Sequence, residues 1–277
     1  MGISAEVPTK EQLEKYKKLK NYLASFQGVA VAFSSGVDSA LLLYAAKEAL
    51  GDRAIAVTAA SGAFPKRELA EAKEFCAEHG ILQEIVEFRE MEVEGFRENP
   101  KNRCYICKKA LFEEIRKAAA AHGIDTVAEG SNLDDLGDYR PGLTAIAELG
   151  IESPLRACGL TKSDIRALSR YLGLPAWNKP SYACLASRFV YGENITPEKL
   201  SMVGQAEQLL LDLGFSQVRV RIHGLIARIE VLPEEFSKLL DNRSVIVKSF
   251  REYGFTYVSM DLAGYRTGSM NETILSQ

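Results

Sequence analysis

The sequence predicts an α/β protein, with a doubly wound parallel sheet followed by a smaller α+β domain. Three observations lead to this prediction. Short apolar runs alternate with helical patterns through residues 16–171, which is typical of a parallel sheet. A stretch rich in Pro, aromatic and small residues, 174–191, interrupts the alternation. The order after it becomes helix, strand, strand, helix, strand, which indicates a separate small α+β domain.

The elements of the sheet domain follow from the apolar periodicity. Strands are expected at 28–33, 53–58, 82–88 and 126–128. Helices are expected to end near residues 26 and 50 and to cover 65–79, about 108–122, about 141–149 and 162–171, with an apolar stretch at 151–155. This part of the chain, 1–175, is predicted to form the nucleotide-binding domain.

The remaining elements form the predicted second domain. A helix is expected at 197–213, strands at 217–222 and 226–231 joined by a turn at His223-Gly224, a helical stretch at 233–253 and a strand at 255–261. We therefore predict a functional linker at 176–192 that contains Cys184, and a substrate-binding or oligomerisation domain at 193–277.

Composition restricts the class of protein. The chain has 277 residues, of which 47% are hydrophobic, and its net charge is only −3, so there is no global basic field to attract nucleic acid. Residues 1–20 are polar and no segment is apolar enough to span a bilayer. The odd number of five cysteines argues against a disulfide framework. These features predict a soluble cytoplasmic protein.

The most informative motif is Ser34-Ser35-Gly36-Val37-Asp38-Ser39, which connects the strand at 28–33 to the following helix. Backbone N–H groups at a helix start lack intrahelical partners and favour phosphate oxygens. The Lys that a Walker-type loop requires is absent. The motif instead resembles the PP-loop of ATP pyrophosphatases, S-G-G-x-D-S, with Ser35 in place of the second residue, normally Gly. This resemblance implies a reaction that cleaves ATP between its α and β phosphates. The alternative is a serine-rich cap without a ligand.

A second motif is Cys104-Tyr105-Ile106-Cys107, with basic residues on both sides. Two residues between the cysteines allow both thiolates to reach one metal or cluster, and a cationic helix start lowers the thiol pKa. A stable site needs a third ligand, for which Cys184 is the candidate and Cys158 the competitor. Three thiolates without a nearby His favour an iron–sulfur cluster with one open iron, with zinc or a dithiol pair as alternatives. Cys76 is expected to be a buried apolar residue.

A third group is basic. Arg219 and Arg221 alternate along one predicted strand, so both guanidinium groups lie on the same face and could grip a phosphate. The other members of this group are Arg188, Arg228 and Arg266. The alternative is a solvated sheet face. An acidic turn with Asp134, Asp135 and Asp138 could hold Mg²⁺ or ribose hydroxyls, or could simply solvate a loop.

Motifs from both predicted domains together resemble the LarE sulfur transferases. They are Ser34 to Ser39, Asp138-Tyr139-Arg140-Pro141-Gly142, Trp177-Asn178-Lys179, Ser187-Arg188-Phe189, Arg219-Val220-Arg221 and Asp261-Leu262-Ala263-Gly264-Tyr265-Arg266. The resemblance implies an enzyme of nickel-pincer nucleotide biosynthesis that uses ATP and Mg²⁺. Such enzymes adenylate the carboxylates of pyridinium-3,5-biscarboxylic acid mononucleotide and then install sulfur.

The family has two versions, and this chain resembles the second. One version sacrifices a single cysteine, whereas the other has a C-x-x-C and a linker cysteine that hold a [4Fe-4S] cluster, whose open iron can carry the hydrosulfide. The implied catalytic residues and cluster ligands are Cys104, Cys107 and Cys184, with Asp38 also catalytic. ATP or pyrophosphate would bind Ser34, Ser35, Gly36, Asp38 and Ser39. The substrate phosphate would bind Ser187, Arg188, Arg219, Arg221 and Arg266.

The resemblance also suggests a homo-oligomer, and it leaves the sulfide donor open. Three alternative functions remain at this point. A tRNA thiolation enzyme also pairs a PP-loop with cysteines, although the acidic net charge argues against folded RNA as a partner. A non-catalytic iron–sulfur carrier or sensor would explain Ser35, and an amidating PP-loop ligase would leave the three cysteines unexplained.

Overall fold

The computed structural model describes residues 7–137, 141–180 and 184–266 of the chain. The chain divides into two compact units. The first unit comprises Met1–Ser61, Lys66–Phe88 and Cys104–Ser181, and the second comprises Gly62–Pro65, Arg89–Arg103 and Tyr182–Gln277. Two short segments from the N-terminal half therefore belong to the second unit. The functional boundaries at 175 and 192 stay a prediction.

The first unit is built on a parallel sheet of four strands in the order β3-β2-β1-β4. The strands are β1 (Val29–Ala32), β2 (Ala54–Ala60), β3 (Leu82–Glu87) and β4 (Val127–Ala128). The register pairs Val31 of β1 with Ala56 of β2 on one side and with Ala128 of β4 on the other. The prediction of a doubly wound parallel sheet is confirmed. Because the chain winds from β1 to β3 and returns to β4, the strand order reverses beside β1, where such sheets bind ligands.

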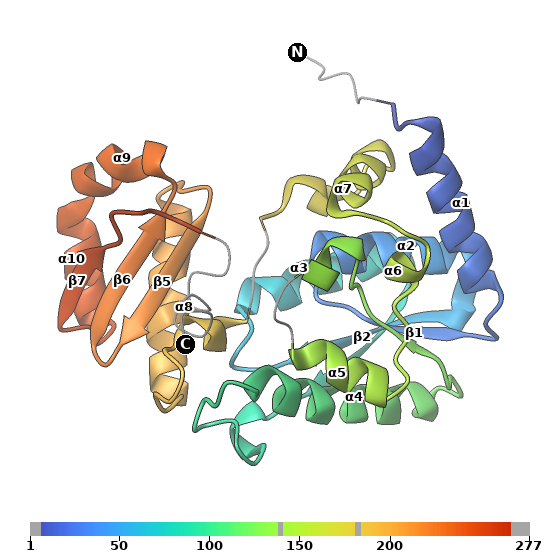
Figure 1. Cartoon of the computed structure of the whole chain (residues 1–277), viewed down its shortest axis with the longest axis horizontal. Helices are drawn as coiled ribbons and strands as arrows, with labels where there is room; N and C mark the ends of the chain where they lie inside the picture. Colours follow the sequence, from blue (N-terminus) through green and yellow to red (C-terminus); the bar gives the residue numbers. More distant parts are fainter. Residues whose placement is uncertain (1–6, 138–140, 181–183, 267–277) are drawn as a thin grey trace. The chain divides into compact units, whose positions relative to one another are not determined.

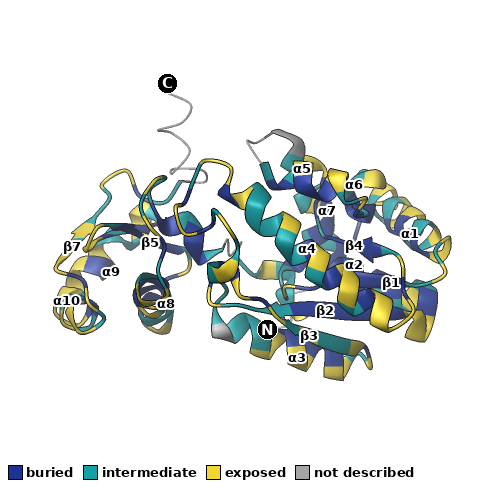
Figure 2. Ribbon diagram, turned by 90° about the horizontal axis from the view of Figure 1, so that it is seen from below, coloured by how far each residue is buried: buried dark blue, intermediate teal, exposed yellow. Residues whose placement is uncertain are grey.

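Helices cover both faces of this sheet (Figure 1). One face packs against α1 (Lys10–Ala24), α2 (Val37–Leu50), α3 (Lys66–Glu78), α6 (Pro154–Ala157) and α7 (Lys162–Tyr171). The other face packs against α4 (Arg103–Ala121) and α5 (Pro141–Glu148). Val31 faces the first core and Ala30 the second, as the period of two in a strand requires. Strands β1 and β2 are accordingly buried on both faces, whereas β3 at the edge is partly exposed (Figure 2).

Capping interactions fix the ends of two helices. Thr9 and Gln12 form a reciprocal capping box at the start of α1, and Thr161 and Asp164 do the same for α7. The Asp164 carboxylate also accepts hydrogen bonds from Gln12 Nε2 at 3.2 Å and from Lys15 Nζ at 2.9 Å. The same carboxylate therefore caps α7 and ties that helix to α1.

The second unit contains a sheet of three strands in the order β5-β6-β7. β5 (Val218–His223) runs antiparallel to β6 (Ile226–Val231), and β7 (Tyr257–Met260) runs parallel to β6. α8 (Pro197–Asp212) packs against β5, and α10 (Arg243–Glu252) packs against β7 and α8. The helical stretch expected at 233–253 is present, but Asn242 divides it into α9 (Phe236–Asp241) and α10.

The start of α4 also differs from the expectation. The helix begins at Arg103, five residues before 108, because the backbone turns into the helix as soon as it leaves Pro100 and the N–H of Arg103 donates to the Pro100 carbonyl. Both cysteines of the C-x-x-C consequently lie in the first turns of the helix. None of the helices in the described ranges combines the length and the hydrophobicity needed to span a bilayer.

Candidate functional site

The Ser34–Ser39 loop lies at the carboxyl end of β1, beside the point where the strand order reverses. Gly36 is the N-cap of α2, and no side chain caps the helix there. Ser39 Oγ accepts from the Ser34 N–H at 3.3 Å and donates to the Gly36 carbonyl at 3.1 Å, which folds the loop back on itself. Helix α2 thus begins with N–H groups that no side chain caps at its N-cap, as an anion cradle requires.

Ser35 has a left-handed backbone conformation, with φ of +55°. This value explains why the related motif has Gly at this position. The Ser35 hydroxyl donates to Glu68 Oε2 at 3.0 Å, and Lys179 Nζ donates to the Ser35 carbonyl and hydroxyl at 3.2 and 2.9 Å. Lys179 also contacts Glu68 Oε2 at 2.9 Å and the carboxylate of Glu71. Two carboxylates from α3 and one lysine therefore stabilise the strained loop.

Asp38, in the first turn of α2, is held by groups from two other segments. Lys162, the first residue of α7, forms an ion pair with Asp38 Oδ2, and Asn132 Nδ2 donates to Asp38 Oδ1 at 3.2 Å. Gly130 permits this approach, because a Cβ there would lie 3.1 Å from the backbone nitrogen of Ser39. The ends of β1 and β4 and the start of α7 thus meet at the loop.

The segment after β4 carries further polar groups. Glu129 is buried and accepts hydrogen bonds from Ser131 Oγ at 2.8 Å and Ser153 Oγ at 2.6 Å. Asp134 accepts from the backbone N–H of Lys162 at 2.8 Å, and Asp135 accepts from that of Asn132 at 2.9 Å. Both aspartates thus stabilise the turn and the start of α7, and a role for them with Mg²⁺ or ribose stays a prediction. Asp138 lies outside the described residues.

The cysteines of the C-x-x-C lie three positions apart on α4, so they share one side of the helix. Cys104 is exposed and Cys107 is half-buried. Cys184, in the second unit, is half-buried and precedes a short 3-10 turn, Leu185–Arg188. Neither unit by itself, within its described part, gathers three His, Cys, Asp or Glu side chains suited to a metal ion. Cys104 and Cys107 belong to the first unit and Cys184 to the second, and a shared cluster of the three thiolates stays a prediction.

Cys158 and Cys76 occupy a different environment. Both side chains are buried in the core beneath α1, α2 and α3, on the opposite face of the sheet from α4. Burial raises the pKa of the Cys76 thiol to about 12 and also raises that of Cys158. Neither thiol is placed to act together with Cys104 and Cys107, which removes Cys158 as the competing third ligand.

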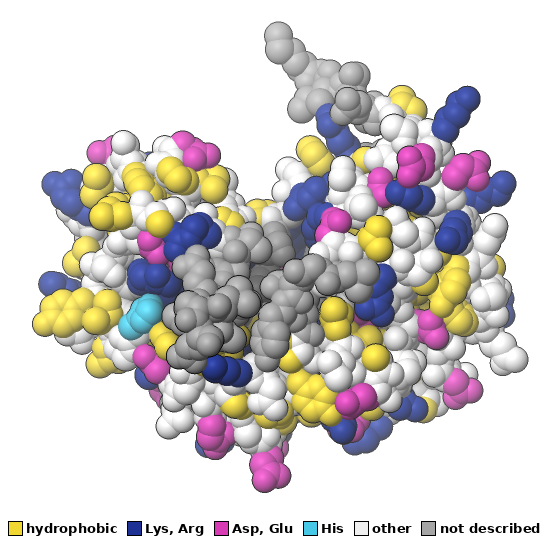
Figure 3. Space-filling model, in the orientation of Figure 1, with side chains coloured by type: hydrophobic (Ala, Val, Ile, Leu, Met, Phe, Trp, Pro, Cys, Tyr) yellow, Lys and Arg dark blue, Asp and Glu magenta, His cyan; other side chains and the backbone are white. Residues whose placement is uncertain are grey.

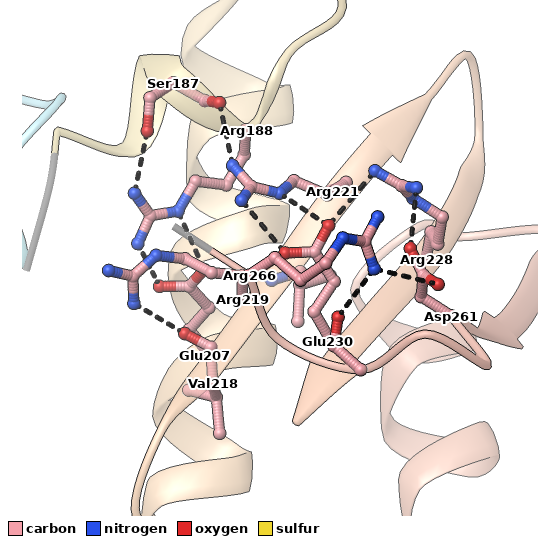
Figure 4. A network of polar contacts seen from close by, with 12 residues as sticks. Ser187, Arg188, Glu207, Val218, Arg219, Arg221, Arg228, Glu230, Asp261 and Arg266 are labelled. Carbon is pink, nitrogen blue, oxygen red and sulfur yellow. Dashed lines mark hydrogen bonds and ion pairs between the residues drawn. The ribbon is translucent and has the colours of Figure 1, made fainter. Parts of the chain in front are cut away.

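The predicted basic group forms a network in the second unit (Figure 4). Arg188 is 1% exposed and pairs with Glu207 of α8 through two hydrogen bonds of 2.8 Å. Burial alone would lower the pKa of Arg188, but the charge and hydrogen bonds of Glu207 raise it. The Arg188 guanidinium also donates to the Ser187 hydroxyl at 2.9 Å. The turn that follows Cys184 is therefore anchored to α8.

The other arginines extend this network across the sheet (Figure 4). Arg221 pairs with Glu230, and Arg228 bridges Glu230 at 3.1 Å and Asp261 at 2.8 Å. Arg266 lies 3.7 Å from Asp261, and Arg219 stacks over the Tyr265 ring at 5.3 Å. Burial and the neighbouring charge of Arg188 lower the pKa of Arg219 to about 10.

Five guanidinium groups are gathered in this network, those of Arg188, Arg219, Arg221, Arg228 and Arg266. Among the contacts given above for the described residues, their carboxylate partners are Glu207, Glu230 and Asp261. Arg188, Arg219 and Arg221 are buried, and charges in such a setting interact more strongly than in water. On the face drawn in Figure 3, basic and acidic side chains of the first unit are interspersed.

Comparison with known proteins places these features in a family. A family model described as NAD synthase matches residues 11–119, the part of the chain that contains the Ser34–Ser39 loop. A pyridinium-3,5-bisthiocarboxylic acid mononucleotide synthase of Lactiplantibacillus plantarum is 37% identical over 91% of this chain and 92% of its own length. The chain belongs to the LarE family.

Two further relatives are uncharacterised. A protein of Synechocystis is 42% identical over 94% of this LarE chain and 98% of its own length. A protein of Methanocaldococcus jannaschii is 30% identical over 92% of the chain and 98% of its own length. The similarity thus extends through both units.

Several residues at the loop of this LarE chain were not singled out from the sequence. Lys162, Asn132 and Glu68 are distant in sequence from the loop, and only the fold brings them to it. Lys162 had one sequence signal, because it follows the helix cap Thr161 after a strand-like stretch. Lys179 was part of a family motif, but its motif did not indicate which segment it would contact.

Proposed function

We propose that this chain is an ATP-dependent sulfur transferase that acts on pyridinium-3,5-biscarboxylic acid mononucleotide in nickel-pincer nucleotide biosynthesis. The observation that carries the proposal is the similarity to the L. plantarum synthase across both units, combined with an anion cradle at the strand reversal. That relative is named for its bisthiocarboxylic product.

The first half-reaction is adenylation at the Ser34–Ser39 loop. The backbone of Ser35 and Gly36 and the hydroxyls of Ser34, Ser35 and Ser39 would bind the phosphates of ATP. A substrate carboxylate oxygen attacks the α phosphorus, and the bond to pyrophosphate breaks. Asp38 offers carboxylate oxygens of the type that Mg²⁺ prefers, with the phosphates and water as its other ligands.

Lys162 would take part in the same half-reaction. Its ammonium group contacts Asp38 directly, so it lies at the start of α2 where the phosphates would bind. A positive charge there stabilises the negative charge that develops on departing pyrophosphate. Bound Mg²⁺ would replace Lys162 on Asp38, which would leave the lysine to pair with a phosphate oxygen.

The arginine network would hold the phosphate of the substrate. The clustering of five guanidinium groups in the second unit supports this role, as does the forked geometry with which guanidinium groups bind phosphate. Ser187, Arg188, Arg219, Arg221 and Arg266 are the proposed contacts. Binding energy from this remote phosphate would orient the carboxylates for reaction.

Cys104, Cys107 and Cys184 would hold a [4Fe-4S] cluster. Their thiol donors suit iron, two of them share one accessible side of α4, and the buried Cys158 lies on the other face of the sheet. When bound, the cluster supplies the sulfide that displaces AMP from the activated carboxyl group. The role of the chain is to hold the three thiolates and to keep the acyl adenylate oriented.

A coupled assay tests this function. The cluster-loaded protein is incubated with ATP, Mg²⁺, sulfide and the pyridinium substrate, and AMP and thiocarboxylate are measured by mass spectrometry. We expect AMP release that depends on the substrate and equals the sulfur incorporated, and Asp38→Asn should abolish both. A parallel reaction with tRNA should release no AMP. AMP release with tRNA, or none with the pyridinium substrate, would overturn the proposal.

A further inference from the structure

Two buried polar residues of the second unit, Asn99 and Arg103, lie against the loop that carries Cys184. They belong to the segment Arg89–Arg103, which precedes α4 but packs in the second unit. Asn99 is 0% exposed and Arg103 is 3% exposed. Burial of an arginine to this degree is unusual unless its charge and donors are satisfied.

The contacts of this pair converge on the backbone after Cys184. Arg103 Nη1 donates to Asn99 Oδ1 and, at 2.8 Å, to the carbonyl of Ala186. Asn99 Nδ2 donates to the carbonyl of Val190 at 2.7 Å, and the Gly192 N–H donates to the Asn99 carbonyl at 2.9 Å. The two side chains and the Asn99 backbone carbonyl thus hold the backbone at three points between 186 and 192. We call Asn99 and Arg103 the Asn99–Arg103 clamp.

The backbone at Asn99 has a strained conformation, which the residue adopts together with these contacts. Its φ is +51°, in the left-handed region, which Asn tolerates better than most residues but which still carries an energetic cost. Such conformations persist when the surrounding structure fixes them, and they are concentrated at functional sites. The hydrogen bonds to Arg103 and Val190 supply that fixation.

Other groups hold the same loop from its opposite end. The N–H of Leu185 donates to the Ala63 carbonyl at 2.9 Å, and the Cys184 carbonyl accepts from Arg188 Nη1 at 3.1 Å. Together with the clamp, these bonds engage the backbone groups Cys184 O, Leu185 N and Ala186 O in succession. The backbone around Cys184 is therefore held both by a nearby residue, Arg188, and by residues distant in sequence, Ala63 and Arg103.

We propose that Asn99 and Arg103 are positioning residues that hold Cys184 in place for the three-cysteine site, an inference that rests on the proposed function. Arg103 directly precedes Cys104 in the chain. The residue that starts the helix of the C-x-x-C is therefore the one whose side chain bonds to the Cys184 loop.

Thiol reactivity tests the clamp without any metal. In the reduced, metal-free full chain, alkylation of Cys184 by iodoacetamide is followed by mass spectrometry for Asn99→Gly, Arg103→Ala and Arg103→Lys. Gly tolerates the positive φ, so Asn99→Gly removes the amide contacts without adding strain. The control is Arg97→Lys, because Arg97 is exposed on the same segment and its guanidinium donates to the Met91 carbonyl, at 2.7 Å, within that segment.

We expect Cys184 to react roughly tenfold faster in Asn99→Gly and Arg103→Ala, because losing buried hydrogen bonds lets the loop open locally. Arg103→Lys should restore part of the protection, and the control should match the parent. Amide exchange in α8 should stay slow, which separates local opening from unfolding of the unit. If amide exchange in α8 becomes fast in Arg103→Ala, that variant has unfolded the unit, and the reactivity of Cys184 in Asn99→Gly tests the clamp. Parental Cys184 reactivity in Asn99→Gly would overturn the clamp.

Iron retention separates this inference from the proposed function. After anaerobic reconstitution, iron loss to a chelator is measured for the parent and Asn99→Gly, and we expect loss at least roughly fivefold faster in the variant. A parent that takes up no iron would overturn the three-cysteine site itself. Equal retention in parent and variant would overturn the positioning role of the clamp alone.

Discussion

Lys179 Nζ donates hydrogen bonds to both the carbonyl and the hydroxyl oxygen of Ser35, at 3.2 and 2.9 Å. Ser35 stands where the related motif has Gly, and its φ is +55°. The hydroxyl that Gly lacks is used here for contacts with Lys179 and Glu68. The chain therefore keeps the loop conformation of the motif with a different residue, which it stabilises through α3 and the segment after α7.

Replacing Ser35 tests this explanation. Both Ser35→Gly and Ser35→Ala lose the hydroxyl contacts, but only Ala keeps the cost of the left-handed backbone. We expect the Gly variant to be more stable than the Ala variant by about 1 kcal/mol in urea unfolding. Ser25 is the matched control, because its φ is −74° and its hydroxyl also bonds to a carbonyl, that of Tyr22. At Ser25 the Ala variant should instead be more stable than the Gly variant. If Ser35→Ala is as stable as Ser35→Gly, this explanation is contradicted.

The ion pair between Lys162 and Asp38 leads to a prediction about nucleotide affinity. Lys162→Ala should weaken binding of a non-hydrolysable ATP analogue about 10- to 100-fold, as expected for loss of one charge-assisted hydrogen bond. Isothermal titration calorimetry measures the Kd. Lys117→Ala is the control, since that exposed lysine pairs with Glu114 on α4, on the opposite face of the sheet from α2. An unchanged Kd for Lys162→Ala would remove the lysine from the phosphate site.

The arginine network predicts a substrate effect that is independent of the cluster. Arg221→Ala should raise the KM for the pyridinium mononucleotide by at least about tenfold, because a charged contact to phosphate is lost. The iron content should be unchanged. With the dephosphorylated substrate, Arg221→Ala and the parent should have the same KM. The control variant at an exposed arginine, Arg251→Ala, should match the parent in KM and in iron content. Loss of iron in Arg221→Ala would contradict the assignment.

Asp164 predicts how the stability of the first unit depends on pH. Burial alone would raise the pKa of this carboxyl group, but hydrogen bonds from Lys15, Thr161 and Gln12 lower it below the usual 3.8. A carboxyl group with a lowered pKa in the folded state stabilises the fold above its unfolded pKa. That stabilisation is lost as the pH falls from about 4 through the folded value. Thermal unfolding from pH 7 to pH 2 should show a smaller decrease in Asp164→Asn, and identical pH profiles would refute the link.

Much of the fold could be predicted because its signals are local. The apolar runs and the loop after β1 predicted the parallel sheet, whose strands are buried on both faces as continuous apolar sequences require. The break at Asn242 was missed because an apolar period continues through it, and the start of α4 was missed because the apolar pattern begins only after the cysteines.

The candidate site was predictable only in part, for a physical reason. Ser34–Ser39 lies on one loop, and one sequence window is enough to recognise it. Lys162, Asn132 and Glu68 reach that loop from α7, from the end of β4 and from α3, and no local pattern encodes such long-range contacts. The pairing of Arg188 with Glu207 was likewise not predicted. Glu207 lies on α8, an amphipathic helix, where the sequence alone does not distinguish a buried carboxylate from an exposed one.

The most direct test of the central claim is to count the sulfur atoms transferred per protein chain and to measure the intact mass of the protein afterwards. The cluster-loaded enzyme is given excess pyridinium substrate, ATP, Mg²⁺ and sulfide. We expect several thiocarboxylates per chain and an unchanged protein mass. The Cys104, Cys107, Cys184 triple Ala variant should form no thiocarboxylate. At most one sulfur per chain, together with a protein lighter by one hydrogen sulfide at Cys184, would show that the cysteine is consumed and would contradict the central claim.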